Sequence, residues 1–565
     1  NSTKKLSEYF PLHGAVFLPP IEFDFFIGNS FTSGKFLANL ESVRPILDVA
    51  ISDAHKKYLK NWIPKKKNWL NILESPIKEC EDQKTAAWAA LEAVQWTNGS
   101  GLDISFGPAC DYVLATVHRI LSFYRVPMFT NAGFSEFFQE KPDKLLTRVG
   151  PLQDHITMML DRLAKQFSWK KPLIMYEKSF WESELHEAGF CKLLMNGVYL
   201  WTVRRKWDLQ VTPKLLDPFW DDQNPREVLK KLLIDSVGVN HGVIILCASP
   251  DTVREIMLSA HDLGMATSGE YVFINIDVST GSHAEKPWIR ANDTNSPENE
   301  KAKEAYKALK TISLRRSDLD EYKNFESRVK ERAEKKYNYS AKTGKEYEMN
   351  NFISAFYDAV LLYAIALNET LAEGLDPRNG RNITSKMWNR TFVGITGNVS
   401  IDQNGDRYSD YSLLDLDPTQ DKFVEVAYYS GAQNALRQMT EFHWVGGSPP
   451  KDSPICGWDH SKCDTGIPLY TWLLIASFVI ILFLLIGFGF FYRRYRLERE
   501  LAAMSWKIRW EELEGDDVSR KERKKKRSRK MDIYNHPDQS EALLRSNSRV
   551  SITSDKVGSL TSYKD

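Results

Sequence analysis

The sequence lacks the residue patterns on which most enzyme active sites depend. It contains no Gly-rich phosphate loop, no His-Arg-Asp triplet, and no Ser/His/Asp set, metal-ligand cluster or pair of carboxylates at a catalytic spacing. The eleven histidines are scattered, and only six cysteines occur in 565 residues. We therefore expect no catalytic residue, no metal and no organic cofactor in this chain.

Charge is absent from one long stretch. Residues 469–492 (LYTWLLIASFVIILFLLIGFGFFY) form an uncharged, predominantly apolar run of 24 residues. As a helix with a rise of about 1.5 Å per residue it would be about 36 Å long, enough to cross a hydrocarbon core of about 30 Å. A helix in a soluble core is rarely free of charge over such a length, so the run predicts a membrane span.

The flanks of this run predict its orientation. Arg493, Arg494 and Arg496 follow it directly and no such cluster precedes it, which predicts a cytoplasmic C-terminal side and a single-pass type I protein of the plasma membrane. All cysteines and all Asn-X-Ser/Thr sequons precede the run, as an oxidising, glycan-adding compartment predicts, although a longer segment also collects more of every residue. The sequons lie at Asn1, Asn98, Asn292, Asn338, Asn368, Asn382, Asn389 and Asn398.

The basic block near the C-terminus and the start of the chain say less about function than the apolar run does. Residues 520–530 (RKERKKKRSRK) form a basic block, which suits anionic lipid of the inner leaflet and equally suits a solvated linker. A nucleic-acid partner is disfavoured because the chain is tethered to a membrane. The chain begins at Asn1 without a signal peptide, so we expect a mature form from which the signal has been removed.

The part before the apolar run alternates short apolar strands with amphipathic helices, which is typical of parallel α/β layers. Its roughly 460 residues exceed one ordinary core and fit two lobes. Strands are predicted at 69–73, 102–106, 127–130, 173–176, 242–247 and 271–276, and helices at 45–57, 84–95, 111–123, 154–167, 226–235 and 251–263.

Two later features complete this pattern. A longer helix is predicted at 349–374, ended by Gly374 and Pro377, and a strand with a hairpin at 399–411, where Asn404-Gly405 favours a tight turn. Parallel sheets bind ligands at the carboxyl ends of their strands. Two lobes joined by crossing segments add a cleft that closes by hinge motion.

Several motifs point to one family. They are residues 106–112 (FGPACDY), 125–130 (RVPMFT), 245–251 (ILCASPD), 382–392 (NITSKMWNRTF), 394–397 (GITG) and 401–406 (IDQNGD), with 497–501 (LEREL) and 506–511 (WKIRWE) beyond the apolar run. From about residue 60 onward the chain resembles the membrane guanylyl cyclases, most closely the natriuretic peptide receptors. The first 60 residues match poorly.

The resemblance implies an α/β fold with a two-lobed, periplasmic-binding-protein-like (type I) ectodomain, a single transmembrane helix and a short cytoplasmic juxtamembrane tail. The expected boundaries are 1–455 for the ligand-binding region, 456–468 for a juxtamembrane cysteine segment, 469–492 for the helix and 493–565 for the tail. It also implies a homodimer and an extracellular peptide ligand.

The resemblance further implies a disulfide pattern. It pairs Cys80 with Cys110 and Cys191 with Cys247, which leaves Cys456 and Cys463 as a local pair. An interchain bridge from Cys456 or Cys463 in a dimer stays open, because the sequence alone allows many connectivities for six cysteines.

Peptide contacts carry over from the family at four positions. Asp82 matches an acidic contact, Tyr112 an aromatic one, Arg119 a basic one and Tyr176 a second aromatic one, and this chemistry suits a peptide interface. Each has a structural alternative: an N-cap for Asp82, a salt bridge on its helix for Arg119, and a core position for either tyrosine.

This chain departs from the family at other contact positions. Lys192-Leu193 stands where the family has an aromatic pair, and Asp143 or Lys144 replaces a further aromatic. We therefore expect a ligand other than a vertebrate-type natriuretic peptide.

The family also holds chloride near its Gly-Pro-Gly-Cys turn, and a helix N-terminus favours an anion. Ala109 stands here in place of a glycine. The N–H groups of Ala109 and Cys110 and the hydroxyl of Ser75 remain possible chloride ligands.

The C-terminal tail suggests signalling. Leu497, Leu501, Met504 and Ile508 follow a short heptad seam, which a helix lying on the membrane would share; in a dimeric receptor this helix would pass a shift inward. Ser546, Ser548, Ser551, Thr553 and Ser554 near Arg545 and Arg549 suit kinases or an ordinary disordered tail.

Two functions remain open. The first is a receptor guanylyl cyclase of which this chain is the N-terminal portion, with pseudokinase and cyclase modules expected beyond Asp565. The second is a binding-only receptor, such as a clearance or decoy receptor, with a short tail. The absences described above disfavour an ectodomain that is itself an enzyme.

Overall fold

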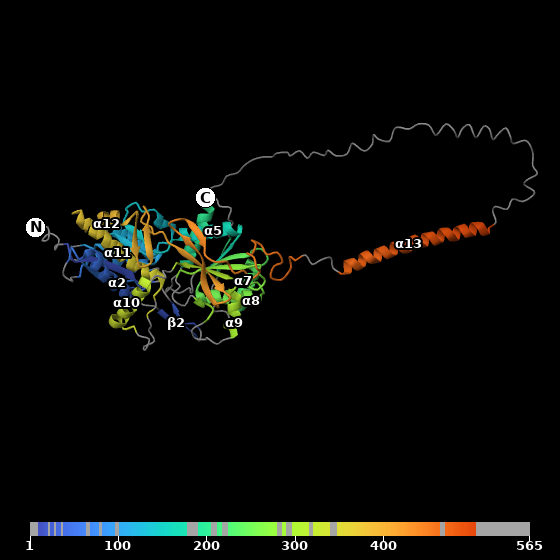
Figure 1. Cartoon of the computed structure of the whole chain (residues 1–565), viewed down its shortest axis with the longest axis horizontal. Coiled ribbons are helices and arrows are strands. Elements are labelled where there is room, and N and C mark those ends of the chain that lie inside the picture. Colours follow the sequence, from blue (N-terminus) through green and yellow to red (C-terminus); the bar gives the residue numbers. More distant parts are fainter. Residues whose placement is uncertain are drawn as a thin grey trace, which may run out of the picture. The chain divides into compact units, whose positions relative to one another are not determined.

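Apolar strands and amphipathic helices fold into two sheets with helices on their faces in the computed structural model of the chain (Figure 1). The structure describes residues 9–20, 23–27, 30–34, 38–63, 68–77, 82–96, 101–177, 190–204, 212–216, 224–278, 285–289, 297–315, 320–339, 347, 349–463 and 469–503. Two compact units are present, Asn1–Asp464 and Thr465–Asp565. The first takes in the two sheets and most of the predicted cysteine segment.

The first sheet is five-stranded, parallel and ordered β4-β1-β5-β6-β7. Alternate residues of β1, an interior strand of this sheet, enter two different cores, as the two-residue period of a strand requires. Ala15 and Phe17 pack with helices α3 and α4, whereas Val16 and Leu18 pack with α2 and α11. The bounds are β1 Leu12–Leu18, β4 Leu70–Pro76, β5 Ile104–Phe106, β6 Met128–Thr130 and β7 Leu146–Arg148.

Helices from two distant stretches of chain cover this sheet. The helices are α2 Leu40–Ala54, continued by η1 His55–Leu59, then α3 Gln83–Gln95, α4 Asp111–Phe123, α10 Asp320–Tyr337, α11 Asn351–Ala372 and α12 Gly380–Met387. A short turn η2 Glu136–Gln139 and the hairpin of β13 Arg390–Gly394 with β14 Gly397–Ile401 complete this lobe. A separate hairpin pairs β2 Phe23–Ile27 with β3 Ser30–Gly34.

The second sheet has eight strands in the order β17-β16-β15-β12-β11-β10-β8-β9. The five strands from β12 to β9 are parallel, and β15, β16 and β17 extend it in antiparallel fashion. The strands are β8 Leu173–Glu177, β9 Thr212–Leu216, β10 Val243–Cys247, β11 Val272–Ile276, β12 Leu309–Leu314, β15 Tyr411–Asp417, β16 Lys422–Ser430 and β17 Ala435–Gln438. The helices are α5 Gln153–Phe167, α6 Phe190–Arg204, α7 Pro225–Ser236, α8 Pro250–Asp262 and α9 Pro297–Tyr306.

The lobes are joined by segments that run alongside one another, which we call the hinge segments: residues 148–152 and 406–411. They are held together by hydrogen bonds from Arg407 N to Arg148 O (3.0 Å), from Ser409 Oγ to Gly150 O (3.1 Å) and from Tyr411 OH to Leu152 O (3.1 Å). The end of β12 joins them, because Arg315 N donates to Asp410 O (3.0 Å). The predicted two-lobed arrangement thus has a defined connection.

The second unit contains one long helix, α13 Leu469–Ala502. It includes the whole predicted span and continues for ten residues past Tyr492, with ion pairs Arg494–Glu498 and Arg496–Glu500 along its side. Two described helices are long and apolar enough to cross a membrane, α13 and part of α11. They differ in burial, since the apolar window of α11 is 89% buried inside its lobe and that of α13 is not buried at all. Met504, Ile508, the basic block and the serine-rich tail lie outside the described residues.

All six predicted strands coincide with observed ones, and the predicted helices coincide within a few residues apart from one start. The helix predicted from Pro45 begins at Leu40, because Asn39 caps it through a reciprocal capping box with Ser42 and Pro45 lies inside it. The structure also differs from the prediction at the hairpin expected at 399–411. Regular antiparallel pairing joins β13 to β14 around residues 394–397, whereas the Asn404-Gly405 turn closes a single bridge between Ile401 and Arg407.

Candidate functional site

The Gly-Pro-Ala-Cys turn positions helix α4 at the carboxyl edge of the first sheet. Gly107 has φ +81°, and a Cβ there would come within 3.0 Å of the carbonyl oxygen of Phe17. Ser105 Oγ donates to Gly107 O (2.9 Å) and Thr130 Oγ1 donates to Pro108 O (2.6 Å). The turn therefore has little freedom, and α4 starts from a fixed point.

Asp111, the first residue of α4, ties this helix to the loop after β6. Its carboxylate accepts backbone N–H groups from Gly133 (2.9 Å), Phe134 (3.2 Å) and Ser135 (2.7 Å). Burial raises the pKa of Asp111, and the three N–H donors and the charge of Arg148 oppose that rise.

The predicted chloride ligands lie on one edge of this sheet. Ser75 is paired with Phe17 across β4 and β1, and Gly107 approaches Phe17 from the other side. Cys110 is the N-cap of α4 and has extended backbone. Ala109 is not among the described residues with positive φ, so its Cβ requires no left-handed strain. The role of these residues in holding chloride stays a prediction.

Three of the four predicted peptide-contact residues lie on the first lobe. Tyr112 and Arg119 are exposed and two turns apart on α4, and Arg119 lies over the ring of Phe137 (5.1 Å to its centroid) instead of in an ion pair with a described residue. Asp82 is the N-cap of α3 and accepts from Thr85 N (2.8 Å), as its structural alternative predicted. Helices α3 and α4 are in contact through a hydrogen bond from Thr116 to Gln83 (3.3 Å).

The fourth, Tyr176, lies on the second lobe. It is half-buried on β8, is paired in register with Cys247 of β10 and packs against the main core. The next residue, Glu177, accepts from Ser249 N (2.9 Å) and Thr252 Oγ1 (3.0 Å) at the start of α8. The four positions are thus divided between the lobes, and their role in binding stays a prediction.

A buried charge network fixes the hinge, and sequence reasoning missed it. Arg148 donates two hydrogen bonds to Asp406 (2.6 and 2.7 Å), and Lys141 pairs with the same carboxylate and donates to Asn404 O (2.9 Å). Burial acts to raise the pKa of Asp406, but Arg148 and Lys141 outweigh it and the net shift is downward. Burial lowers the pKa of Lys141 to about 8. The Asn404-Gly405 turn was visible in the sequence, whereas its partners more than 250 residues away were not.

A second missed feature is the segment 442–463, which we call the strap because it is bound along the second lobe. Trp169 Nε1 donates to Pro450 O (2.7 Å), and Gly242 N donates to Asp452 O (2.7 Å). Near its beginning, the buried Lys310 bonds Asp415 (2.7 Å) and the carbonyl of His443 (2.7 Å). The strap fixes the end of this unit to the base of β10 and β11.

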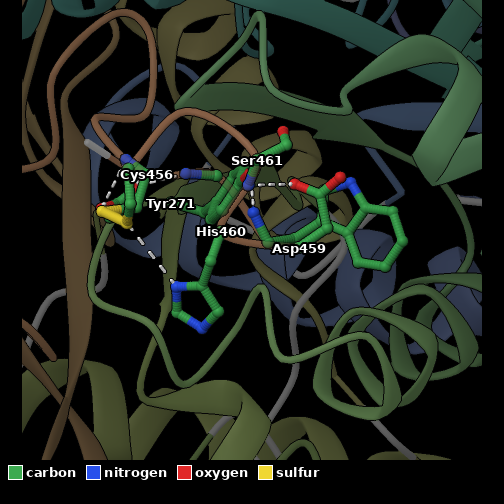
Figure 2. Close-up of a disulfide and its surroundings, with 9 residues drawn as sticks. Tyr271, Cys456, Asp459, His460 and Ser461 are labelled. Atoms are coloured by element: carbon green, nitrogen blue, oxygen red, sulfur yellow. Dashed lines mark hydrogen bonds between the residues drawn. A yellow bond between two sulfur atoms is a disulfide. The ribbon is translucent and has the colours of Figure 1, made fainter. Parts of the chain in front are cut away.

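The strap ends in a disulfide loop. Glu270 accepts from the N–H groups of Cys456 (3.0 Å) and Gly457 (2.9 Å), and Tyr271 OH accepts from Trp458 N (2.9 Å). Figure 2 shows Tyr271 beside Cys456 and the imidazole of His460 directed toward the disulfide.

The disulfides follow the pattern that the resemblance implies. Cys191 is bonded to Cys247 (Cα–Cα 5.4 Å) and Cys456 to Cys463 (Cα–Cα 4.2 Å), so the interchain alternative is not adopted here. Cys110 is disulfide-bonded, and Cys80 lies outside the described residues. No described cysteine is free.

The sequons differ in accessibility. Asn338, Asn389 and Asn398 are exposed. Asn368 is half-buried on α11 and accepts from Trp62 Nε1 (2.7 Å), and Asn382 donates to Asp376 O (3.1 Å). Asn1, Asn98 and Asn292 lie outside the described residues.

Two lobes, one with a parallel sheet and one with a mixed sheet that has a parallel part, are joined by a hydrogen-bonded hinge. This arrangement defines a ligand-binding protein of the periplasmic-binding-protein-like class. Residues 66–419 match the family described as the receptor family ligand binding region, and the chain belongs to that family.

Named relatives refine the comparison. The chain is 51% identical to the receptor-type guanylate cyclase gcy-28 of Caenorhabditis elegans, over 97% of this chain and 44% of that protein. It is 29% identical to the atrial natriuretic peptide receptor 3 of Rattus norvegicus, over 82% of this chain and 84% of the relative. It is 30% identical to the human atrial natriuretic peptide receptor 2, over 75% of this chain and 40% of that protein. The chain thus spans less than half the length of two of these relatives.

Proposed function

We propose that this chain is the ligand-binding and membrane-spanning part of a single-pass cell-surface receptor for an extracellular peptide, and that the full-length protein makes cyclic GMP. The observation that carries the proposal is the 51% identity to a receptor-type guanylate cyclase, which covers 97% of the chain. The receptor ligand-binding region accounts for residues 66–419, and the unburied apolar helix α13 follows it.

The proposed orientation is type I, with the lobes outside the cell. Arg493, Arg494 and Arg496 lie directly after the apolar part of α13, where the positive-inside rule expects cytoplasmic residues. The described disulfides and the exposed sequon residues all belong to the first unit. An epitope tag at the C-terminus should be reached by antibody only after permeabilisation, and labelling of intact cells would overturn the orientation.

The proposed peptide site uses the exposed side of α4 on the first lobe and Tyr176 on the second lobe. Tyr112 offers an aromatic surface that is 40% exposed, and the guanidinium of Arg119 on the same helix face can pair with an acidic group. Tyr176 extends the site to the second lobe, so a bound peptide would favour one relative position of the lobes.

We also propose a homodimer formed through α3 and α4. Trp88 (70% exposed) and Phe123 (82% exposed) leave large apolar surfaces open there, with Tyr124 beside Phe123. Phe123→Asp should convert a dimer into a monomer in light scattering of the detergent-solubilised chain. A dimer that persists would place the interface elsewhere.

Chloride is proposed as a structural ion at the start of α4, held by the N–H groups of Ala109 and Cys110 with Ser75. Peptide affinity should then fall when chloride is replaced by gluconate, and Ser75→Ala should weaken the dependence. An affinity that is the same in both salts would remove chloride from the proposal.

The function is tested in cells that express the full-length protein. Secreted peptides should include one that raises cyclic GMP, and Tyr112→Ala with Arg119→Glu should abolish the response while surface expression persists. Lys231→Ala, an exposed change on α7 of the second lobe, serves as the control and should leave the response intact. Constitutive output that no peptide alters would contradict the proposal.

A second candidate is a binding-only receptor. The observation in its favour is that the chain covers 84% of the rat atrial natriuretic peptide receptor 3. A transcript that ends at residue 565 without further domains would select it, whereas one that continues into kinase-like and cyclase motifs would select the first.

A further inference from the structure

The disulfide loop at the end of the strap contains a third ligand-type side chain. His460 lies between Cys456 and Cys463, and its Nδ1 is 3.9 Å from Cys463 Sγ. The ligand atoms of all three residues lie within 4.8 Å of one another. Among the described residues, no other group of histidine, cysteine and carboxylate side chains has this geometry.

The loop is held in place by contacts that do not involve sulfur. Glu270 and Tyr271 bind the N–H groups of residues 456–458, as described above. Ser453 Oγ donates to Asn240 O (2.8 Å), and Lys462 Nζ donates to the carbonyl of Val239. Opening the disulfide would therefore leave both cysteines close to His460.

We propose that residues 456–463 form a redox-gated site for a zinc-type divalent metal ion, with the thiolates of Cys456 and Cys463 and Nδ1 of His460 as ligands once the disulfide is reduced. Tetrahedral Zn²⁺ binds thiolate at about 2.3 Å and imidazole at about 2.0 Å, which places sulfur and nitrogen about 3.5 Å apart and the two sulfur atoms about 3.8 Å apart. The present separation of Nδ1 from Cys463 Sγ is 3.9 Å. The two sulfur atoms must move apart, the other separations need to change by about 1 Å or less, and the fourth position remains open for water.

The reductant is a small thiol. Two molecules of thiol cleave the disulfide by successive exchange and leave as one small disulfide, while Cys456 and Cys463 each gain a hydrogen. Metal binding then displaces two protons, one from each thiol. Access is available from solvent, since Asp459 and His460 are exposed and Ile455 is 60% exposed. By contrast, Cys247 in the other described disulfide is fully buried.

The site would preserve loop closure under reducing conditions. Leu469, the first residue of α13, is six positions after Cys463. A metal ion would hold the loop closed at the point where the chain leaves the strap.

The test uses the whole chain in detergent micelles and Co²⁺ as a spectroscopic probe. The oxidised protein should show no thiolate-to-cobalt charge-transfer band. After reduction and removal of the reductant, such a band with tetrahedral d–d absorption should appear at one Co²⁺ per chain, and Zn²⁺ should displace it. The double variant Cys456→Ser/Cys463→Ser gives the baseline, so any contribution from other opened disulfides is subtracted.

The ligand role of His460 is tested separately. His460→Ala should bind Co²⁺ roughly tenfold or more weakly after reduction, because even outer-shell changes at metal sites cost that much affinity. His261→Ala, a change of a histidine on α8 that is not among the three ligand-type residues, is the matched control and should bind as the parent does. The proposal is overturned if the reduced parent and the double serine variant give the same spectrum, or if His460→Ala binds like His261→Ala.

Discussion

Gly405 lies in the turn that presents Asp406 to the hinge, and two separate constraints act on it. Its φ is +75°, and a Cβ there would overlap the indole ring of Trp388. Trp388 cannot move freely, because its Nε1 donates to Thr147 (2.8 Å) and Lys141 lies over its ring (5.7 Å). Glycine is therefore required at this position both by the left-handed backbone of the turn and by the close packing of Trp388.

Gly405→Ala should lower the free energy of unfolding by about 3 kcal/mol, from left-handed strain and from displacement of Trp388. Gly264→Ala is a matched control, because Gly264 has φ +80° and nothing within 4 Å of its Cβ position. It should cost about 1 kcal/mol from strain alone. Urea unfolding of both variants measures the difference, and equal losses would show that Trp388 contributes nothing.

His155 makes stability depend on pH. It is buried beside the hinge, accepts from Ser409 N (3.4 Å), and burial lowers its pKa to about 4. The unfolded chain takes up this proton near the ordinary value of 6.5, so stability is lost as pH falls from 6.5 toward 4. At pH 5 the loss from this residue is about 2 kcal/mol.

His155→Gln should remove that loss. When the pH falls from 7 to 5, the parent should lose about 2 kcal/mol more of its free energy of unfolding than the variant does. Asp103, whose pKa burial raises to about 6, acts in the opposite direction, but it is present in both proteins and cancels in the comparison. An identical pH dependence in both would contradict the assignment to His155.

Among elements, the strap depends on one acidic side chain. Glu270→Ala removes the acceptor for the N–H groups of Cys456 and Gly457, so their hydrogen exchange should become at least about fivefold faster, for a loss of about 1 kcal/mol or more. Asp459→Ala is the control, because Asp459 bonds Ser461 within the loop (3.0 Å). Unchanged exchange in Glu270→Ala would mean that the disulfide alone fixes the loop.

The elements differ in how well the sequence predicts them, and the reason is burial of polar residues. Strand β10 reads as a continuous apolar run because both faces are covered, and it was predicted. Strand β12 is equally buried but contains Lys310, Thr311 and Ser313, and it was missed. Lys310 is tolerated there because Asp415 on the adjacent β15 pairs with it, a relation that appears only after folding.

The candidate site follows the same rule. The family resemblance led to Tyr112, Arg119 and Tyr176, and the structure positions them on the expected helix and strand. The hinge partners Arg148 and Asp406 are 258 residues apart, so no local pattern connects them. The strap was equally invisible, because its contacts are mostly to backbone atoms, which any sequence supplies.

At the scale of the whole first unit, the buried charges hold the two hinge segments together. Asp406→Asn keeps the shape of the side chain but removes the carboxylate that pairs directly with the buried Arg148 and Lys141. It should lower the free energy of unfolding by about 3–5 kcal/mol. Asp410→Asn in the same hinge segment is the control, since an amide oxygen can still accept from Gly431 N (2.9 Å), and it should cost under about 1 kcal/mol. If Asp406→Asn and Asp410→Asn lowered the free energy of unfolding by similar amounts in thermal unfolding, the buried charge network would not be what stabilises the hinge.

The length of α13 has a mechanical consequence. Of its 34 residues, ten follow the apolar run, and ion pairs at four-residue spacing brace that extension. Each residue turns a helix by about 100°. A stiff helix would therefore pass a rotation to any domain joined beyond it, and the orientation of that domain would depend on the number of residues between them. Inserting or deleting one residue there would swing an attached module by more than a quarter turn.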